Sequence, residues 1–145
     1  MSAPTTVHID AAALAAIDAH ARAEQPRECC GLLVGTSVEA SRLLRVDRAA
    51  PTRNAADEPT RRYLIDPADH FRLLRELRHA GDAARAIIGV YHSHPASRPE
   101  PSPTDLAEAL PNFLYLIASP DMGRHSRAWW LVDGNFLEIP LVHSS

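Results

Sequence analysis

The sequence predicts a single α/β (α+β) domain over residues 1–145, in which a mixed central sheet is flanked by helices. Two kinds of pattern indicate this fold. Apolar residues recur at helical spacing in residues 11–24 and from residue 67 to about residue 80. Residues 86–91 and 113–118 are instead short apolar runs, as is typical of buried strands. The length of 145 residues, 46% of them hydrophobic, fits one globular domain without internal repeats.

The helices are predicted from their start signals. Asp10 is a favourable N-cap for a helix over Ala11–Glu24. Pro67 suits the first position of a second helix, because that position needs no backbone N–H, and Asp66 is its expected cap. A short third helix is expected to begin after Ser102.

The strands are predicted from apolar or β-branched runs between turn residues. Asp133-Gly134 is typical of a tight hairpin turn, so the last two strands are expected to pair antiparallel. Residues 49–62 contain two prolines and no apolar period, which predicts an irregular loop. The expected strands are Cys30–Val34, Arg42–Val46, Tyr63–Ile65, Ala86–Tyr91, Phe113–Ala118, Ala128–Val132 and Phe136–Ile139.

Charge and composition exclude several classes of protein. The net charge is -3 with both signs interspersed, so we expect no nucleic-acid partner. No apolar run approaches the ~20 residues that cross a bilayer, and no secretory signal is visible. We therefore expect no membrane association and a cytoplasmic location. All 15 Lys and Arg residues are arginine, which excludes chemistry that needs a phosphate-loop or Schiff-base lysine.

Cys29 and Cys30 are adjacent in the sequence. They cannot form a disulfide framework or two separated pairs of metal ligands, and a reducing compartment suits them. Free cysteines are usually small buried apolar residues, so we do not expect a catalytic thiol. The sequence assigns them no role.

Two histidines and an aspartate form a candidate metal site. His92 and His94 are separated by one residue at the end of a predicted strand. Side chains of alternate strand residues share a face, so both imidazoles can bind one ion. Asp105, on the first turn of the predicted third helix, supplies a carboxylate. Three protein ligands leave a tetrahedral zinc ion with one open position, as catalytic zinc sites require, so Zn²⁺ is the expected cofactor.

Ser102 and Asp105 also match a second, structural pattern. Ser-x-x-acid before a helix, with Pro103 at the first position, is close to a capping box. This role does not exclude metal binding, because a carboxylate on a first helical turn is rigid. Both interpretations therefore stay open.

These residues together resemble the JAMM (MPN-plus) metalloprotease family. The pattern is a glutamate, here Glu28, followed by His-x-His-x7-Ser-x2-Asp from His92 onward. The resemblance covers residues 11–139, and residues 63–67 also resemble small stand-alone bacterial members. It implies a cytidine-deaminase-like JAMM/MPN architecture.

The resemblance also implies a role for each matched residue. His92, His94 and Asp105 would bind zinc, Glu28 would be the general base, and Ser102 would support the oxyanion. The implied reaction is zinc-dependent hydrolysis of a peptide or isopeptide bond.

The implied partner is a ubiquitin-like or sulfur-carrier protein, cleaved after its C-terminal Gly-Gly. The loop of residues 49–62 and Arg98 are candidates for gripping that tail. The alternatives are a peptidoglycan-peptide hydrolase or a non-catalytic MPN-type binding module. Nucleoside deaminases are excluded, because their His-x-Glu and Pro-Cys-x-x-Cys signature does not occur here. The sequence indicates neither the type of scissile bond nor the oligomeric state.

Overall fold

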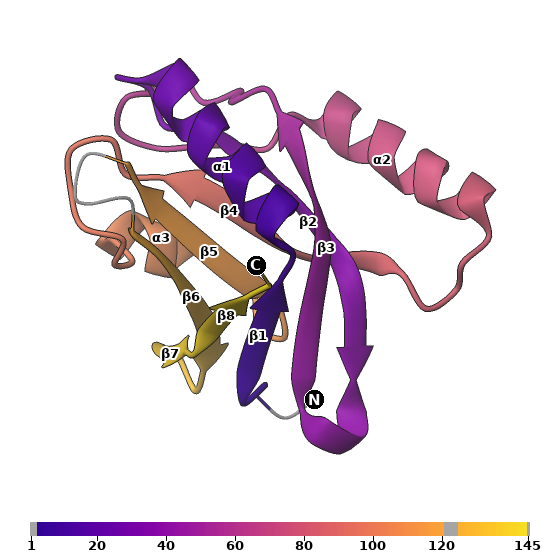
Figure 1. The fold of residues 1–145 in the computed structure, drawn as a ribbon. Coiled ribbons are helices and arrows are strands. Elements are labelled where there is room, and N and C mark those ends of the chain that lie inside the picture. The colour runs from indigo at the N-terminus through magenta and orange to yellow at the C-terminus, as the bar shows by residue number, and fades with distance from the viewer. Residues whose placement is uncertain (1–2, 121–124, 145) are drawn as a thin grey trace.

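The computed structural model describes residues 3–120 and 125–144, which form an eight-stranded mixed sheet with helices on both faces (Figure 1). The strand order is β7-β6-β5-β4-β2-β3-β1-β8. The predicted α+β class with a mixed sheet is therefore confirmed. The elements are β1 (Thr6–Ile9), α1 (Ala11–Glu24), β2 (Cys30–Val38), a 3-10 turn (Glu39–Ser41), β3 (Leu43–Thr52), α2 (Pro67–Ala80), β4 (Ala86–Ser93), α3 (Pro103–Glu108), β5 (Leu114–Ser119), β6 (His125–Val132), β7 (Asn135–Ile139) and β8 (Leu141–His143).

Alternation along the strands divides the core between the two faces of the sheet. Leu33 of β2 belongs to the cluster that contains Ile17 of α1, whereas Leu32 belongs to the cluster that contains Leu73 of α2. Val90 of β4 lies in the α2-side cluster. His92 is two residues further along β4, so it points to the same face.

All three predicted helices are confirmed. The side chain of Asp66 caps α2 by accepting a hydrogen bond from the amide of Ala68 at 3.2 Å. Asp10 occupies the N-cap position of α1 but makes no side-chain capping bond; its carboxylate lies 3.7 Å from the Arg45 guanidinium instead. Among the described residues, no helix is long and apolar enough to cross a membrane.

The prediction of a loop over residues 49–62 is wrong for its first four residues. β3 continues to Thr52, and Pro51 lies opposite Gly31 of β2. β1 pairs only with residues 43–46 of β3, so β3 has no second neighbour at Pro51 among the described residues. Proline lacks the backbone N–H that a central strand needs for pairing on both sides. It is tolerated at this position because, among the described residues, β3 is paired there on one side only.

The predicted strand Tyr63–Ile65 is also wrong, because Ile65 makes only an isolated bridge with Asn54. The Asn54 side chain replaces a strand partner. It donates to the carbonyl of Arg62 and accepts from the amide of Leu64, each at 3.0 Å.

The sequence patterns missed the short parallel strands β1 and β8. The predicted hairpin between β6 and β7 is confirmed. Its turn residues Asp133 and Gly134 have φ angles of 49° and 80°, as such a turn requires.

Candidate metal centre

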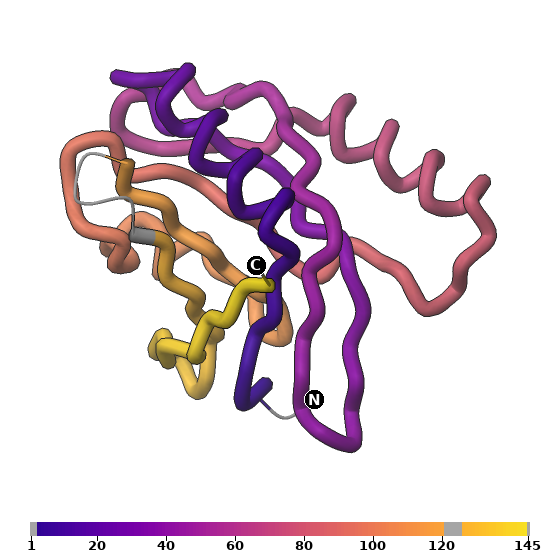
Figure 2. The backbone as a smooth tube through the Cα atoms, in the orientation of Figure 1, coloured from indigo at the N-terminus to yellow at the C-terminus, as the bar shows by residue number. Residues whose placement is uncertain are grey.

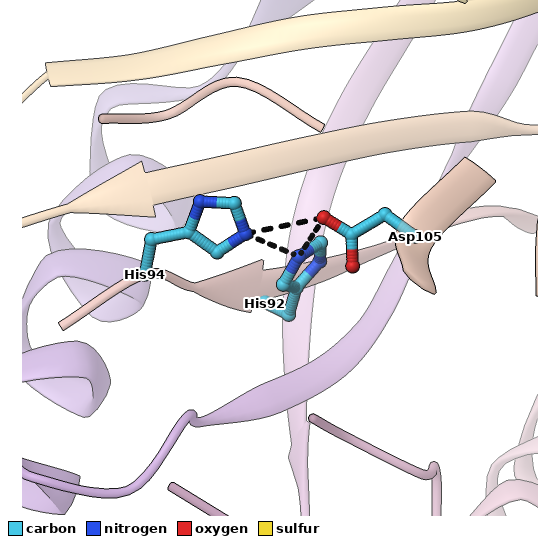
Figure 3. A group of neighbouring side chains, drawn as sticks. All are labelled: His92, His94 and Asp105. Carbon is cyan, nitrogen blue, oxygen red and sulfur yellow. Dashed lines mark hydrogen bonds and ion pairs between the residues drawn. The ribbon is translucent and has the colours of Figure 1, made fainter. Parts of the chain in front are cut away.

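The three predicted metal ligands converge at one end of β4 (Figure 3). His92 lies on β4, and His94 follows its end, where its amide donates to the carbonyl of Ala118 at 2.8 Å. Asp105 approaches from the first turn of α3. Between β4 and α3 the backbone turns back through residues 94–102, a segment with three prolines, which Figure 2 traces. The two histidines are buried, and the Asp105 side chain is 10% exposed.

The ligand atoms form a nearly equilateral triangle. The Nε2 atoms of His92 and His94 are 3.2 Å apart, and Oδ2 of Asp105 lies 3.3 Å from the first and 3.2 Å from the second. A tetrahedral zinc ion with bonds of about 2.0–2.1 Å separates its ligands by about 3.3–3.4 Å. The triangle therefore has the size of one face of a zinc tetrahedron.

The chemistry of the donor set also fits a cation. Nδ1 of His94 lies 2.8 Å from the carbonyl oxygen of Arg98, an acceptor, so Nδ1 carries the proton. In neutral His94 the lone pair of Nε2 then faces the carboxylate oxygen of Asp105, another acceptor. A cation between these atoms removes that repulsion, and neutral imidazole with carboxylate is a common zinc donor set. The residues present thus fit a divalent metal.

The groups around Asp105 determine its ionisation state. Burial alone would raise its pKa, but the adjacent imidazoles of His92 and His94 and the hydrogen bond from the backbone amide of Ser102 hold the pKa well below the usual range. Burial lowers the pKa of His92, which favours the neutral form that binds metals. The carboxylate is therefore ionised at neutral pH and available as a ligand.

The capping box predicted at α3 is confirmed. Ser102 Oγ accepts from the Asp105 amide at 3.0 Å, and Oδ2 of Asp105 accepts from the Ser102 amide at 2.8 Å. One oxygen of Asp105 therefore serves both the cap and the candidate metal site. The hydroxyl hydrogen of Ser102 is not used by the cap and stays available to donate.

Glu28 lies just before β2 and is buried, with 8% exposure. Its Oε1 has no hydrogen-bond partner among the described residues. Burial raises the pKa of this carboxyl to about 7, with Asp105 adding to the effect and His94 opposing it. A group with a pKa near neutrality exchanges protons readily, which suits a general base.

Three positioning contacts were not predicted from the sequence. The amide of Asn54 donates to the carbonyl of Glu28 at 2.9 Å, and the amide of Glu28 donates to the carbonyl of Pro59 at 2.7 Å. Nε1 of Trp129 donates to the carbonyl of Pro99 at 3.0 Å, beside the Arg98 carbonyl that orients His94. These partners are far apart in the sequence, so no local motif signals them.

The cysteines and Ser93 serve the core. Cys29 and Cys30 are both free and buried, and burial raises their pKa values to about 12 and about 11. They are protonated at neutral pH and poor nucleophiles. Ser93 Oγ points away from the site and accepts from the Cys29 amide at 2.8 Å. The side chain of Arg98 is exposed.

A cavity of about 660 Å³ lies on the same face of the sheet as the histidines. The ring of Tyr63 forms one wall of this cavity and is stacked on His92. Leu32 and Val90 of the sheet, with Phe113 and Tyr115, supply an apolar surface. Asp57, Glu58, Arg62 and Glu108 add charge to the lining.

The fold and the His92–His94–Asp105 group define a candidate metalloenzyme on a mixed α+β scaffold. The chain belongs to the Prok-JAB family, the prokaryotic homologs of the JAB domain, whose model matches residues 10–132. The predicted membership of the JAMM/MPN class is thereby confirmed.

Individual proteins are similar over most of this chain. The desampylase of Haloferax volcanii is 41% identical over 123 residues, which cover 84% of this chain and 82% of the relative. The CysO-cysteine peptidase of Mycobacterium tuberculosis is 36% identical over 129 residues, covering 87% and 83%. The solution structure of protein DSY2949 from Desulfitobacterium hafniense matches with a TM-score of 0.83 at 25% identity, covering 95% and 92%. The relatives agree with the predicted peptidase class and fold.

Proposed function

We propose that this chain is a zinc-dependent peptidase that cleaves the peptide or isopeptide bond after the C-terminal Gly-Gly of a ubiquitin-like or sulfur-carrier protein. The observation that carries the proposal is the 3.2–3.3 Å triangle of His92, His94 and Asp105 beside the buried carboxyl of Glu28. Membership of the JAB family and the names of the relatives support it.

His92, His94 and Asp105 hold the metal. A zinc ion bound there supplies Lewis acidity toward a carbonyl oxygen and makes water acidic enough to react near neutral pH. The residues contribute a fixed geometry, because the Asp105 carboxylate is locked by the cap of α3 and the His94 ring by the Arg98 carbonyl. A rigid set of ligands keeps the reacting groups in the orientation that the reaction needs.

Glu28 moves the proton. Its Oε1, which has no hydrogen-bond partner among the described residues, accepts a proton from the attacking water, whose oxygen bonds to the scissile carbonyl carbon. As the carbon–nitrogen bond breaks, the carboxyl returns the proton to the leaving amine. A pKa of about 7 allows both transfers near neutral pH.

Ser102 supports the developing oxyanion. Its oxygen is held by the capping bond to the Asp105 amide, so its hydrogen can be directed toward the reacting carbonyl. A donor aimed at an oxyanion contributes on the order of 10² to 10³ in rate.

The substrate class follows from the surroundings of the site. Strand ends and loops surround the histidines, and an extended tail can bind there through backbone hydrogen bonds. Small residues are needed where that tail passes close to the metal, and a Gly-Gly end meets the need. The relatives named desampylase and CysO-cysteine peptidase favour a protein substrate over a peptidoglycan peptide.

A fusion substrate tests the proposal. A ubiquitin-like domain ending in Gly-Gly, joined to a short C-terminal peptide, is incubated with zinc-loaded protein, and the products are weighed by mass spectrometry. We expect one cut after the second glycine, and replacement of that glycine by valine should lower the rate at least tenfold, ~1.4 kcal/mol in barrier. Equal cleavage of the Gly-Gly and the Gly-Val substrate would contradict the proposed specificity for Gly-Gly. Cleavage only of a stem peptide would favour the peptidoglycan alternative, and no cleavage of either substrate would favour the binding module.

A further inference from the structure

We propose that Tyr63 is a positioning residue for the metal site. Its ring holds the His92 imidazole in the orientation that binds the metal, in place of the hydrogen bond that usually does so. The inference rests on the proposed role of His92 as a ligand. It assigns a function to a residue outside the glutamate, histidine, serine and aspartate pattern.

The two histidines are held by different means. Nδ1 of His94 donates to the Arg98 carbonyl at 2.8 Å, whereas Nδ1 of His92 is buried and has no hydrogen-bond partner among the described residues. Metal-binding histidines almost always use their second ring nitrogen to fix the ring and its tautomer. His92 lacks this device, so another contact must orient its ring.

Tyr63 makes that contact. Its ring lies against the His92 ring with a centroid distance of 4.3 Å and an interplanar angle of 18°, a stacked arrangement. Stacked aromatic pairs of this kind are favourable beyond the area that they bury. Rotation of the imidazole about χ2 by anything other than a half-turn would break the parallel contact. Stacking therefore holds the His92 ring in the plane in which Nε2 lies 3.3 Å from Oδ2 of Asp105.

The backbone beside Tyr63 is itself fixed. Asn54 bonds to both neighbours of the tyrosine, the carbonyl of Arg62 and the amide of Leu64, each at 3.0 Å. The same side chain donates to the carbonyl of Glu28. The Asn54 side chain therefore holds the backbone on both sides of Tyr63 and the backbone carbonyl of Glu28.

The ring of Tyr63, and not its hydroxyl, carries the proposed role. The hydroxyl makes no hydrogen bond to another described residue, whereas the ring face contacts His92. Tyr63→Phe should therefore keep the positioning role, and Tyr63→Leu should lose it. Phe113 offers a matched control, because it is an aromatic residue that lines the same cavity but packs edge-to-face against Tyr115 and not against a histidine.

Zinc affinity tests the inference without using turnover. Full-length wild type, Tyr63→Phe, Tyr63→Leu and Phe113→Leu are freed of metal and titrated with zinc against a chromophoric chelator. Loss of an outer contact to a metal ligand typically costs 10–100-fold in affinity, and we expect that loss for Tyr63→Leu alone. Tyr63→Phe and Phe113→Leu should bind zinc as wild type does.

Three outcomes would overturn the inference: wild-type affinity in Tyr63→Leu, a loss in Tyr63→Phe equal to that in Tyr63→Leu, or an equal loss in Phe113→Leu. Circular dichroism checks the fold of each metal-free variant, and Tyr63→Met replaces the leucine variant, with the same expectations, if that one is unfolded. His94→Ala separates this inference from the proposed function. Zinc binding in that variant as tight as in wild type would remove the metal site itself, whereas an unaltered Tyr63→Leu removes only the role of Tyr63.

Discussion

Cys30 lies directly opposite His92 in the antiparallel pairing of β2 with β4. The pairing continues beyond the strand, since the amide of Ser93 donates to the carbonyl of Cys29 at 3.1 Å. Glu28, two residues before Cys30, is thereby placed opposite His94 and on the same face of the sheet. This register brings the proposed general base to the metal site from a distant part of the sequence.

Removal of one ligand should abolish tight metal binding. We expect wild-type protein to hold about one zinc ion per chain, because three donors form one closed triangle. His94→Ala leaves two donors, so its zinc affinity should fall by more than the roughly 10–100-fold that an outer contact costs. Elemental analysis after dialysis against a weak chelator measures this, and equal zinc in both proteins would place the site elsewhere.

Ser102 has a structural and a proposed catalytic role, which two variants separate. Ser102→Ala removes the capping bond to the Asp105 amide and should cost about 1 kcal/mol of stability. It should also lower kcat by about 10²-fold or more, if the hydroxyl donates to the oxyanion. Ser102→Thr keeps a hydroxyl and should retain most of the stability and most of the turnover of the wild type. Urea unfolding and turnover are measured together; full turnover in a destabilised Ser102→Ala would leave the residue only its capping role.

The buried carboxyl of Glu28 should make the stability of the metal-free protein depend on pH. Its folded-state pKa of about 7 is raised above the ordinary value of 4.5, mainly by burial. Between these values the folded protein binds a proton that the unfolded chain releases, so the free energy of unfolding falls as pH rises. The loss is on the order of 2–3 kcal/mol.

Glu28→Gln removes this titration, and it serves as the comparison. Urea unfolding of both metal-free proteins at about pH 5 and pH 8 isolates the contribution, because all other groups are shared. We expect the variant to gain stability relative to wild type at the higher pH. Parallel behaviour of the two proteins would show that the carboxyl is not perturbed.

The ligand set could be predicted because local geometry encodes it. A His-x-His pair on a strand fixes two side chains on one face, and Ser-x-x-Asp at a helix start fixes a third. The surrounding contacts could not be predicted in this way. Tyr63 reaches His92, and Asn54 reaches Glu28, only through the pairing of distant segments.

The fold shows the same division between local and distant signals. The three helices with cap and proline signals begin where the sequence predicts, whereas β1 and β8 have four and three residues and depend on parallel pairing for their existence. Pro51 indicated a loop, but the open side of β3 makes a strand possible there. Tertiary context decides such positions.

Turnover of Glu28→Gln with its zinc content measured in the same sample tests the central claim most directly. Glutamine keeps the size of the side chain but cannot take up a proton, and Glu28 is not among the three candidate ligands. We predict about one zinc ion per chain, as in wild type, with cleavage of the Gly-Gly fusion lowered by about 10²–10⁴-fold. Wild-type turnover in the zinc-loaded variant would contradict the account.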